Sequence, residues 1–204
     1  MDRQRIGVYG GTFDPIHVGH LLLAEIAREQ LELDRVLFMP AAISPLKQGQ
    51  QVSDGKERVE MIKLAISGNP LFQVDDRELE REGPSYTVDT LAEMANQWPE
   101  AELFFLMGAD SLEEFHLWKS PEEICKKAEV RVLARGGYTF PDISKLEKFL
   151  PTEKLGDSKQ MVIQMPQVEI SASEIRQRTK EKRTIRYQVA PAVEAYIENQ
   201  SLYR

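Results

Sequence analysis

Short apolar runs alternate with longer amphipathic stretches along the whole chain. Runs rich in Val, Ile, Leu, Phe and Met predict buried strands, and stretches with apolar residues three or four positions apart predict helices. The predicted strands cover residues 6–9, 35–39, 72–74, 103–107, 130–133 and 161–163. The predicted helices cover residues 18–31, 54–66, 87–98, 173–182 and 191–199, and one more begins at Ser120-Pro121.

This alternation of strands and helices predicts the α/β class. Because parallel strands need right-handed crossovers, we expect a Rossmann-like, doubly wound, mainly parallel sheet with helices on both faces. The 204 residues, 42% of them hydrophobic, are enough for one proper core. We therefore expect a single domain over residues 1–204 with a small helical C-terminal extension over about 171–204. Residues 136–158 are the least regular part, typical of a flap or of an ordinary surface connection.

In such folds ligands bind beyond the carboxyl ends of the strands. Gly10 follows the first predicted strand, residues 40–47 follow the second, and residues 108–111 follow the strand over 103–107. We expect these three loops to open at one edge of the sheet.

Composition narrows the range of partners and the location. The net charge of -7 argues against a general nucleic-acid binder, which would carry a basic face. The single cysteine cannot form an intramolecular disulfide and fits a reducing compartment. The first five residues run directly into a strand without an apolar signal region, and no stretch is long enough for a membrane span. We expect a soluble cytoplasmic protein with neither nucleic acid nor membrane as partner.

The segment from Gly10 to His20, GGTFDPIHVGH, carries the clearest chemistry. Gly10 and Gly11 let backbone N–H groups approach an anion, and a helix opening near residue 18 adds unpaired donors and a positive dipole end. His17 and His20, three residues apart, can face the same side. This combination suits a polyphosphate.

Three other interpretations of the segment are available. His17 could merely cap the helix while the glycines make room for a structural turn. The two histidines could share a zinc ion, although only His116 and Cys125 would remain as ligands besides carboxylates. The glycines at positions 10, 11 and 19 do not have the spacing of a dinucleotide fingerprint, which argues against hydride chemistry.

A second candidate lies near the C-terminus, in Ile170-Ser171-Ala172-Ser173-Glu174-Ile175-Arg176. Two hydroxyls at a helix opening, with an arginine one turn later, suit a pyrophosphate. Capping alone would explain one of the serines.

The two segments resemble the T/H-x-G-H signature and the I-S-x-T-x-I-R element of the nucleotidyltransferase superfamily. Four further stretches resemble a single branch, the bacterial nicotinate-nucleotide adenylyltransferase family, from about Ile6 to Tyr203. They are Gly83-Pro84-Ser85-Tyr86-Thr87-Val88-Asp89-Thr90-Leu91, Met107-Gly108-Ala109-Asp110, Trp118, and Ala134-Arg135-Gly136-Gly137-Tyr138. The resemblance implies transfer of the adenylyl group of ATP to nicotinic acid mononucleotide, giving deamido-NAD and pyrophosphate with the help of Mg²⁺. It also leaves a homodimer open.

The resemblance further implies roles for individual residues. The catalytic set is His17, His20, Lys47 and Arg176. The ATP-binding set adds Gly10, Gly11, Thr12, Phe13, Gly108, Asp110, Ile170, Ser171 and Ser173. The set for the acceptor substrate is Lys47, Ser85, Tyr86, Thr87, Asp110, Trp118 and Arg135. No protein side chain is assigned to a metal, because the phosphates would hold Mg²⁺.

Two positions depart from the family pattern, and several assignments have simpler alternatives. Leu46 stands where the phosphate loop usually has histidine, and Ala172 stands where a further hydroxyl is common. Trp118 could be a core aromatic, Asp110 an N-cap and Lys47 a solvated lysine. His116 is expected to be a surface or structural histidine.

The absence of a nucleophile-and-base pair predicts catalysis by positioning. No G-x-S-x-G elbow is present, and Cys125 sits beside two lysines in a predicted helix. The acceptor phosphate would attack the α-phosphorus of ATP in line, without a covalent intermediate. Rival functions are transfer to another acceptor, such as phosphopantetheine, FMN, glycerol phosphate or nicotinamide mononucleotide, or non-catalytic nucleotide sensing.

Overall fold

The computed structural model describes residues 3–42, 52–134, 140–154, 158–164 and 166–204. Its centre is a six-stranded sheet in the order β3-β2-β1-β4-β5-β6, with each neighbouring pair parallel. The strands are β1 Arg5–Gly11, β2 Arg35–Pro40, β3 Phe72–Val74, β4 Glu102–Gly108, β5 Glu129–Ala134 and β6 Val162–Gln164. The predicted α/β, Rossmann-like sheet is confirmed.

The helices connect and cover these strands. They are α1 Val18–Gln30, α2 Gly55–Ile66, α3 Thr87–Gln97, α4 Ala109–Glu113, α5 Pro121–Lys127, α6 Ser144–Glu147, α7 Ala172–Lys180 and α8 Pro191–Asn199. The hydrophobic pattern or, for α5, the start signal at Ser120-Pro121 predicted all of them except α4 and α6, which have 5 and 4 residues. Helices this short make little more than one turn, too few residues for the apolar pattern to repeat.

Local sequence signals explain where several helices begin. The side chain of Asp54 accepts a hydrogen bond of 2.8 Å from the backbone N–H of Lys56 and so caps α2. Pro121 occupies the first turn of α5, where its missing N–H costs nothing. These beginnings are set by neighbouring residues, which is why the sequence predicts them well.

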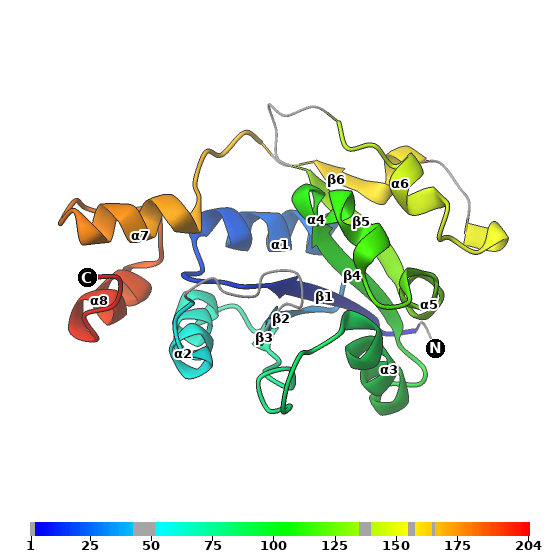
Figure 1. The fold of residues 1–204 in the computed structure, drawn as a ribbon, viewed down its shortest axis with the longest axis horizontal. Helices are drawn as coiled ribbons and strands as arrows, with labels where there is room; N and C mark the ends of the chain where they lie inside the picture. The colour runs from blue at the N-terminus through cyan, green and yellow to red at the C-terminus, as the bar shows by residue number, and fades with distance from the viewer. Residues whose placement is uncertain (1–2, 43–51, 135–139, 155–157, 165) are drawn as a thin grey trace.

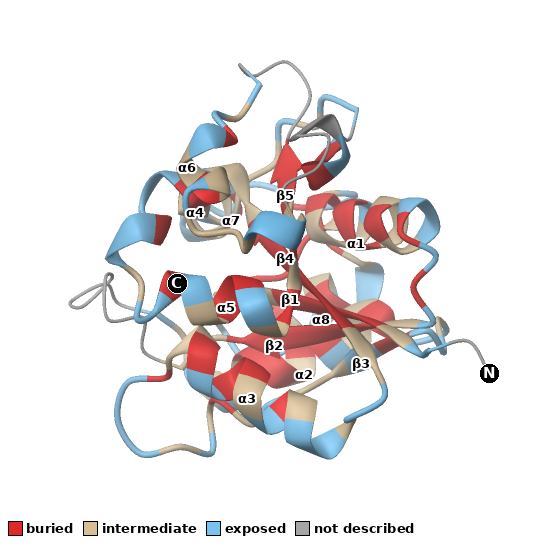
Figure 2. Ribbon diagram, turned by 90° about the vertical axis from the view of Figure 1, so that its right-hand side faces the viewer, coloured by how far each residue is buried: buried red, intermediate tan, exposed pale blue. Residues whose placement is uncertain are grey.

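Side chains of each strand alternate between two cores, one on each face of the sheet. In β4, Phe104 and Leu106 join the core that packs α1, α2, α7 and α8 against the sheet. Phe105 and Met107 join the core beneath α3, α4, α5 and α6. Figure 2 shows the buried residues concentrated in the strands and in the inward sides of the helices. Burial on both faces explains why the strands read as nearly continuous apolar runs.

The C-terminal helices lie near the carboxyl ends of the strands. Figure 1 shows α7 and α8 together at the end of the molecule opposite the N-terminus, and α8 packs against α2. The helical character predicted for residues 171–204 is confirmed. Their division from the rest of the chain as an extension of one domain stays a prediction.

The sheet has its topological switch point at β1 and β4. The chain passes from β1 to β2 with α1 on one face, and reaches β4 with α3 on the other, so the two connections diverge. A crevice between diverging loops is where ligands of this fold bind. Gly10 and Gly11 complete β1 by pairing with Met39 and Pro40, so the turn begins two residues later than the predicted strand end at residue 9.

Candidate active site

An open cleft lies at the switch point, and it brings together four segments of the chain. The first segment is the end of β1 with the residue after it, and the second is the opening of α3. The third is the end of β4 with the start of α4, and the fourth precedes α5. Their lining residues are Gly10, Gly11 and Thr12, then Ser85, Tyr86 and Thr87, then Met107, Gly108 and Ser111, and finally Leu117, Trp118 and Lys119. Ala41, after β2, also lines it. The expectation that the loops after these strands open at one edge is therefore confirmed.

His17 and His20 stand together at the beginning of α1. His17 is the N-cap residue and is 3% exposed, and His20 lies one turn later. Their rings stack with centroids 3.7 Å apart, and the backbone N–H of His17 donates to Nδ1 of His20 at 3.2 Å. The two side chains share one side of the helix opening, as the sequence predicted. The capping position of His17 and a role toward an anion are compatible, because the same helix end offers both.

The Phe13 ring supports the loop after β1 from the core side. Its ring is 2% exposed and packs edge-on against Tyr9 and His20, with centroid distances of 5.4 and 5.0 Å. A side chain at Gly11 would place its Cβ 2.8 Å from this ring, so only glycine fits there. Because the ring of Phe13 is buried, only its main chain can contact a ligand.

The C-terminal segment reaches the same loop. Ser171 caps α7 by accepting from the backbone N–H of Glu174 at 3.2 Å, and its Oγ lies 3.1 Å from Oγ of Ser173. Nη1 of Arg176 donates to the main-chain oxygen of Asp14 at 2.6 Å. Ile170, just before the cap, packs on the core beside α1. The capping interpretation is correct for Ser171, and Arg176 nevertheless stands beside the first motif.

A buried polar group closes the other side of the cleft. The hydroxyl of Ser85 donates to the main-chain oxygen of Glu78 at 3.0 Å, and Oγ1 of Thr90 donates to Oε1 of Glu78 at 2.8 Å. Arg81 in turn donates to Thr90 Oγ1 at 2.7 Å. Burial raises the pKa of Glu78, and the hydrogen bond from Thr90 opposes that effect. The Ser85 hydroxyl is thus already engaged, which leaves Tyr86 and Thr87 at the helix opening to face a ligand.

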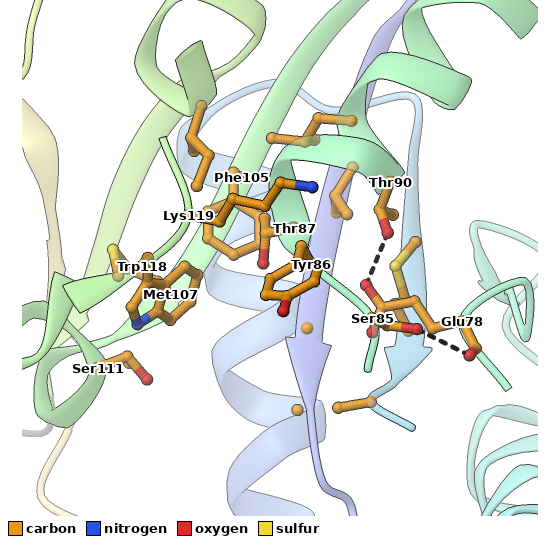
Figure 3. Close-up of a pocket in the computed structure, with 18 of the residues that line it drawn as sticks. Glu78, Ser85, Tyr86, Thr87, Thr90, Phe105, Met107, Ser111, Trp118 and Lys119 are labelled. Carbon is orange, nitrogen blue, oxygen red and sulfur yellow. Dashed lines mark hydrogen bonds between the residues drawn. The ribbon is translucent and has the colours of Figure 1, made fainter. Parts of the chain in front are cut away.

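Two aromatic rings flank this helix opening. Trp118 packs edge-on against Phe105 and Phe115, with centroids 6.0 and 5.4 Å away, and it also lines the cleft. Nζ of Lys119 lies 4.6 Å from the centroid of the Tyr86 ring. Figure 3 shows Tyr86, Trp118 and Lys119 around the same space. Trp118 therefore serves both the core and the cleft wall, and Lys119 is a cation that sequence reasoning missed.

Asp110 has a different place from the one its N-cap interpretation required. Gly108 is the N-cap of α4, and Asp110 lies exposed in the first turn. The N-cap interpretation is wrong, because α4 begins at Ala109, two residues before the first position that Asp110 could cap. From α4 and the residue after it, Ser111 and Glu114 line the cleft.

Two remote residues, Arg58 and Tyr203, contact the loop after β1 and were not predicted. Nη1 of Arg58 donates to the main-chain oxygens of Thr12 and Ala41, both at 2.9 Å. The hydroxyl of Tyr203 donates to Oδ1 of Asp14 at 2.6 Å. No spacing rule links positions so far apart, so the sequence held no signal for these contacts.

Three predicted site positions, Leu46, Lys47 and Arg135, lie outside the described residues. His116 is exposed, as expected, with Nδ1 3.1 Å from the main-chain oxygen of Glu113. Cys125 is fully buried, and burial raises the pKa of its thiol to about 12. A thiol that stays protonated is not an activated nucleophile.

Among the residues that the structure describes, the zinc interpretation of His17 and His20 finds no further ligands. Within the described ranges, no group of three or more His, Cys, Asp or Glu side chains is placed to hold a metal ion.

Among the helices of the described ranges, none is long and apolar enough to cross a membrane.

Comparison with known proteins identifies the family. The family model described as "Cytidylyltransferase-like" matches residues 8–178. A Rhodopirellula baltica protein named "Probable nicotinate-nucleotide adenylyltransferase" is 43% identical over 98% of this chain and 93% of its own length. A Thermus thermophilus protein of the same name is 46% identical over 98% of this chain and all of its own. The chain belongs to the nicotinate-nucleotide adenylyltransferase family.

Solved structures agree on the fold. A Plasmodium falciparum nicotinic acid mononucleotide adenylyltransferase, solved in complex with NaAD, superposes with a TM-score of 0.76 and 20% identity, covering 98% of both chains. At this identity the likeness supports the fold alone. Within this adenylyltransferase chain, the match to the family model includes the first motif and Arg176 and ends before Tyr203.

Proposed function

We propose that this protein transfers the adenylyl group of ATP to nicotinic acid mononucleotide, giving deamido-NAD and pyrophosphate. The observation that carries the proposal is the composition of the cleft region. Gly11 and Thr12 line one end of the cleft, and His17, His20 and Arg176 stand on the loop and helices beside them. At the other end Tyr86 and Trp118 flank a helix opening. A phosphate site joined to an aromatic ring site suits a reaction between a nucleoside triphosphate and a mononucleotide with a flat base.

The phosphate end supports a role in charge stabilisation. We assign Gly10, Gly11, Thr12, the main chain of Phe13, His17 and His20 to the ATP phosphates. Ile170, Ser171, Ser173 and Arg176 go to the departing pyrophosphate, and Gly108 with Asp110 to the adenylate. Backbone N–H groups, imidazoles and a guanidinium are donors, and donors stabilise the charge that grows on phosphoryl oxygens in the transition state.

The donor set also fits a magnesium complex of ATP. Its groups suit phosphate oxygens, and Mg²⁺ takes oxygen ligands and commonly binds through substrate phosphates. Bound in this way, Mg²⁺ neutralises negative charge on the triphosphate. The protein's own donors then hold the triphosphate in line with the acceptor.

The ring end supports recognition of a nicotinate. Thr87 opens α3, where backbone N–H groups without partners inside the helix meet the positive end of the dipole. We assign these donors to the carboxylate of the acceptor and the faces of Tyr86 and Trp118 to its ring. Ser85 contributes by fixing the turn through Glu78. Lys47 and Arg135 stay in the proposed acceptor site on the family resemblance alone.

Reaction then follows from positioning. The acceptor phosphate attacks the α-phosphorus of ATP while pyrophosphate leaves on the opposite side. No group of the protein therefore forms a covalent bond to either substrate. Bringing both substrates into line removes much of the entropic cost of the encounter. The buried Cys125, with its raised thiol pKa, supports a mechanism without a covalent intermediate.

Pyrophosphate release over a panel of acceptors tests the proposal. The panel holds nicotinic acid mononucleotide, nicotinamide mononucleotide, FMN, phosphopantetheine and glycerol phosphate, each with ATP or CTP and Mg²⁺. We expect the highest kcat/KM with ATP and nicotinic acid mononucleotide. Another preferred acceptor would reassign the substrate, and ATP binding without pyrophosphate release would indicate a sensor.

We further propose a cytoplasmic location, which the single cysteine supports. The family resemblance left a homodimer open. Sedimentation of the purified chain distinguishes one copy from two.

A further inference from the structure

The loop after β1 is held from outside the cleft through Asp14. This residue is 3% exposed, and its carboxylate accepts two hydrogen bonds from distant segments. The Tyr203 hydroxyl donates to Oδ1 at 2.6 Å, and the backbone N–H of Ser53 donates to Oδ2 at 3.2 Å. Charge-assisted bonds of this kind are about twice as strong as neutral ones, so the second residue from the C-terminus anchors the first motif.

Arg58 holds the same loop from α2. Its side chain is 3% exposed and spans two loops, because Nη1 donates to the main-chain oxygens of Thr12 and Ala41, both at 2.9 Å. Nε of Arg58 donates to the main-chain oxygen of Ser53 at 3.1 Å. Burial lowers the pKa of Arg58 and the carboxylate of Asp14 opposes this, so the guanidinium remains charged. The planar fork thereby sets the separation of the loops that follow β1 and β2.

Asp14 contacts both Tyr203 and Arg176, a residue of the proposed phosphate site. The main-chain oxygen of Asp14 accepts the 2.6 Å hydrogen bond from Arg176, while its side chain accepts the bond from Tyr203. A shift of Asp14 therefore displaces Thr12 on one side and Arg176 on the other. Neither Arg58 nor Tyr203 is among the described residues that line the cleft.

We infer that Tyr203 and Arg58 are positioning residues for ATP, acting through Asp14 and Thr12. The inference rests on the proposed function for the identity of the nucleotide. Tyr203 is needed to align the triphosphate but not to bind the acceptor. The phosphate end depends on the loop that Tyr203 anchors, whereas Tyr86 and Trp118 stand on other elements.

The test compares Tyr203→Phe with Tyr196→Phe. Both variants remove one hydroxyl from the C-terminal segment, but the phenol of Tyr196 faces the carboxylate of Glu57 in α2, whereas the phenol of Tyr203 donates to Asp14. For Tyr203→Phe we expect kcat/KM for ATP to fall by about tenfold or more, because small misplacements of reacting groups cost that much. The KM for the acceptor and the values for Tyr196→Phe should stay within about twofold of the parent.

Arg58→Lys supplies a second variant. Lysine keeps the charge but cannot span several carbonyls with a planar fork. It should weaken ATP use in the same direction, again without raising the KM for the acceptor. If Arg58→Lys does not fold, the two tyrosine variants decide the question alone.

The measurements distinguish failure of the positioning role of Tyr203 from failure of the proposed reaction. Equal ATP kinetics in Tyr203→Phe and Tyr196→Phe would overturn the inference. So would equal losses toward ATP and acceptor that track the melting temperature, since these indicate a purely structural tyrosine. If the parent protein releases no pyrophosphate with nicotinic acid mononucleotide, the proposed function fails. Titration calorimetry with ATP alone still tests Tyr203, with a weaker Kd in Tyr203→Phe expected.

Discussion

Arg176 and Asp14 are 162 positions apart in the chain, yet Nη1 of the arginine donates a 2.6 Å hydrogen bond to the main-chain oxygen of the aspartate. This bond joins the C-terminal segment to the loop of the first motif. Two segments that each suggest a phosphate site are thus brought into contact.

We expect His20→Ala to lower kcat by about 10²-fold or more, since the imidazole is proposed to stabilise transition-state charge. Loss of the stacking on His17 and of the contact with Phe13 should cost about 1 kcal/mol, which corresponds to about 2–4 °C in Tm for a chain of this size. Steady-state kinetics and thermal unfolding measure the two effects. The exposed His116→Ala is the matched control and should change neither. A large fall in Tm with normal kcat would indicate a structural histidine.

Arg176→Ala should raise the KM for ATP and slow pyrophosphate departure, with a combined loss of about 10²-fold in kcat/KM. The acceptor KM should be nearly unchanged, because the ring end of the cleft stands on other elements. Lys180→Ala removes a positive charge from the exposed end of the same helix and serves as control. Unchanged kinetics with ATP would remove the C-terminal segment from the site.

The acid mononucleotide should be preferred over the amide by about 10²-fold or more in kcat/KM. In the proposed acceptor site the ring substituent would face the backbone donors at the opening of α3, which a carboxylate satisfies and a carboxamide leaves partly unpaired. An unpaired buried donor costs ~1–3 kcal/mol, and two such losses are enough for this preference. Rates with both acceptors at fixed ATP and Mg²⁺ provide the measurement. Equal values would mean that Thr87 and its neighbours do not read the carboxylate.

Cys125 should resist alkylation in the folded protein and react once the chain is unfolded. Burial raises the pKa of its thiol from the ordinary 9.0 to about 12, so the reactive thiolate is scarce at pH 8. Mass spectrometry after iodoacetamide treatment, with and without denaturant, reports the difference. Cys125→Ala should retain kcat within about twofold. Rapid labelling of the native protein, or loss of turnover in the variant, would contradict this assignment.

Glu78 should make stability fall as the pH rises above the ordinary glutamate pKa of 4.5. Because burial raises its folded pKa, the folded state binds a proton more tightly than the unfolded state. This stabilising effect is complete below the unfolded pKa and is lost as the pH rises through the folded value. Glu78→Gln, which mimics the neutral form, should therefore gain in Tm over the parent between pH 4 and 7. A constant difference across that range would mean that Glu78 does not titrate in this way.

Much of this protein follows from the sequence alone, because the physical causes are local. Strands and helices are set by the period of apolar residues, and caps such as Asp54 or Ser171 act on N–H groups only a few positions away. The doubly wound sheet follows from the order of elements and the handedness of crossovers. That His17 and His20 face the same side follows too, since positions three apart are neighbours on a helix surface.

Other features were decided only by the tertiary structure, because they join residues that no periodicity relates. The sequence singled out Arg176 but not its bond to Asp14, and it offered no sign of Arg58 or Tyr203 behind the loop. It could not show that the Phe13 ring turns into the core or that the Ser85 hydroxyl is taken by Glu78. Side-chain direction and burial depend on packing among all the elements at once. The motif therefore showed which residues could bind phosphate, and the fold determined which atoms remain available to do so.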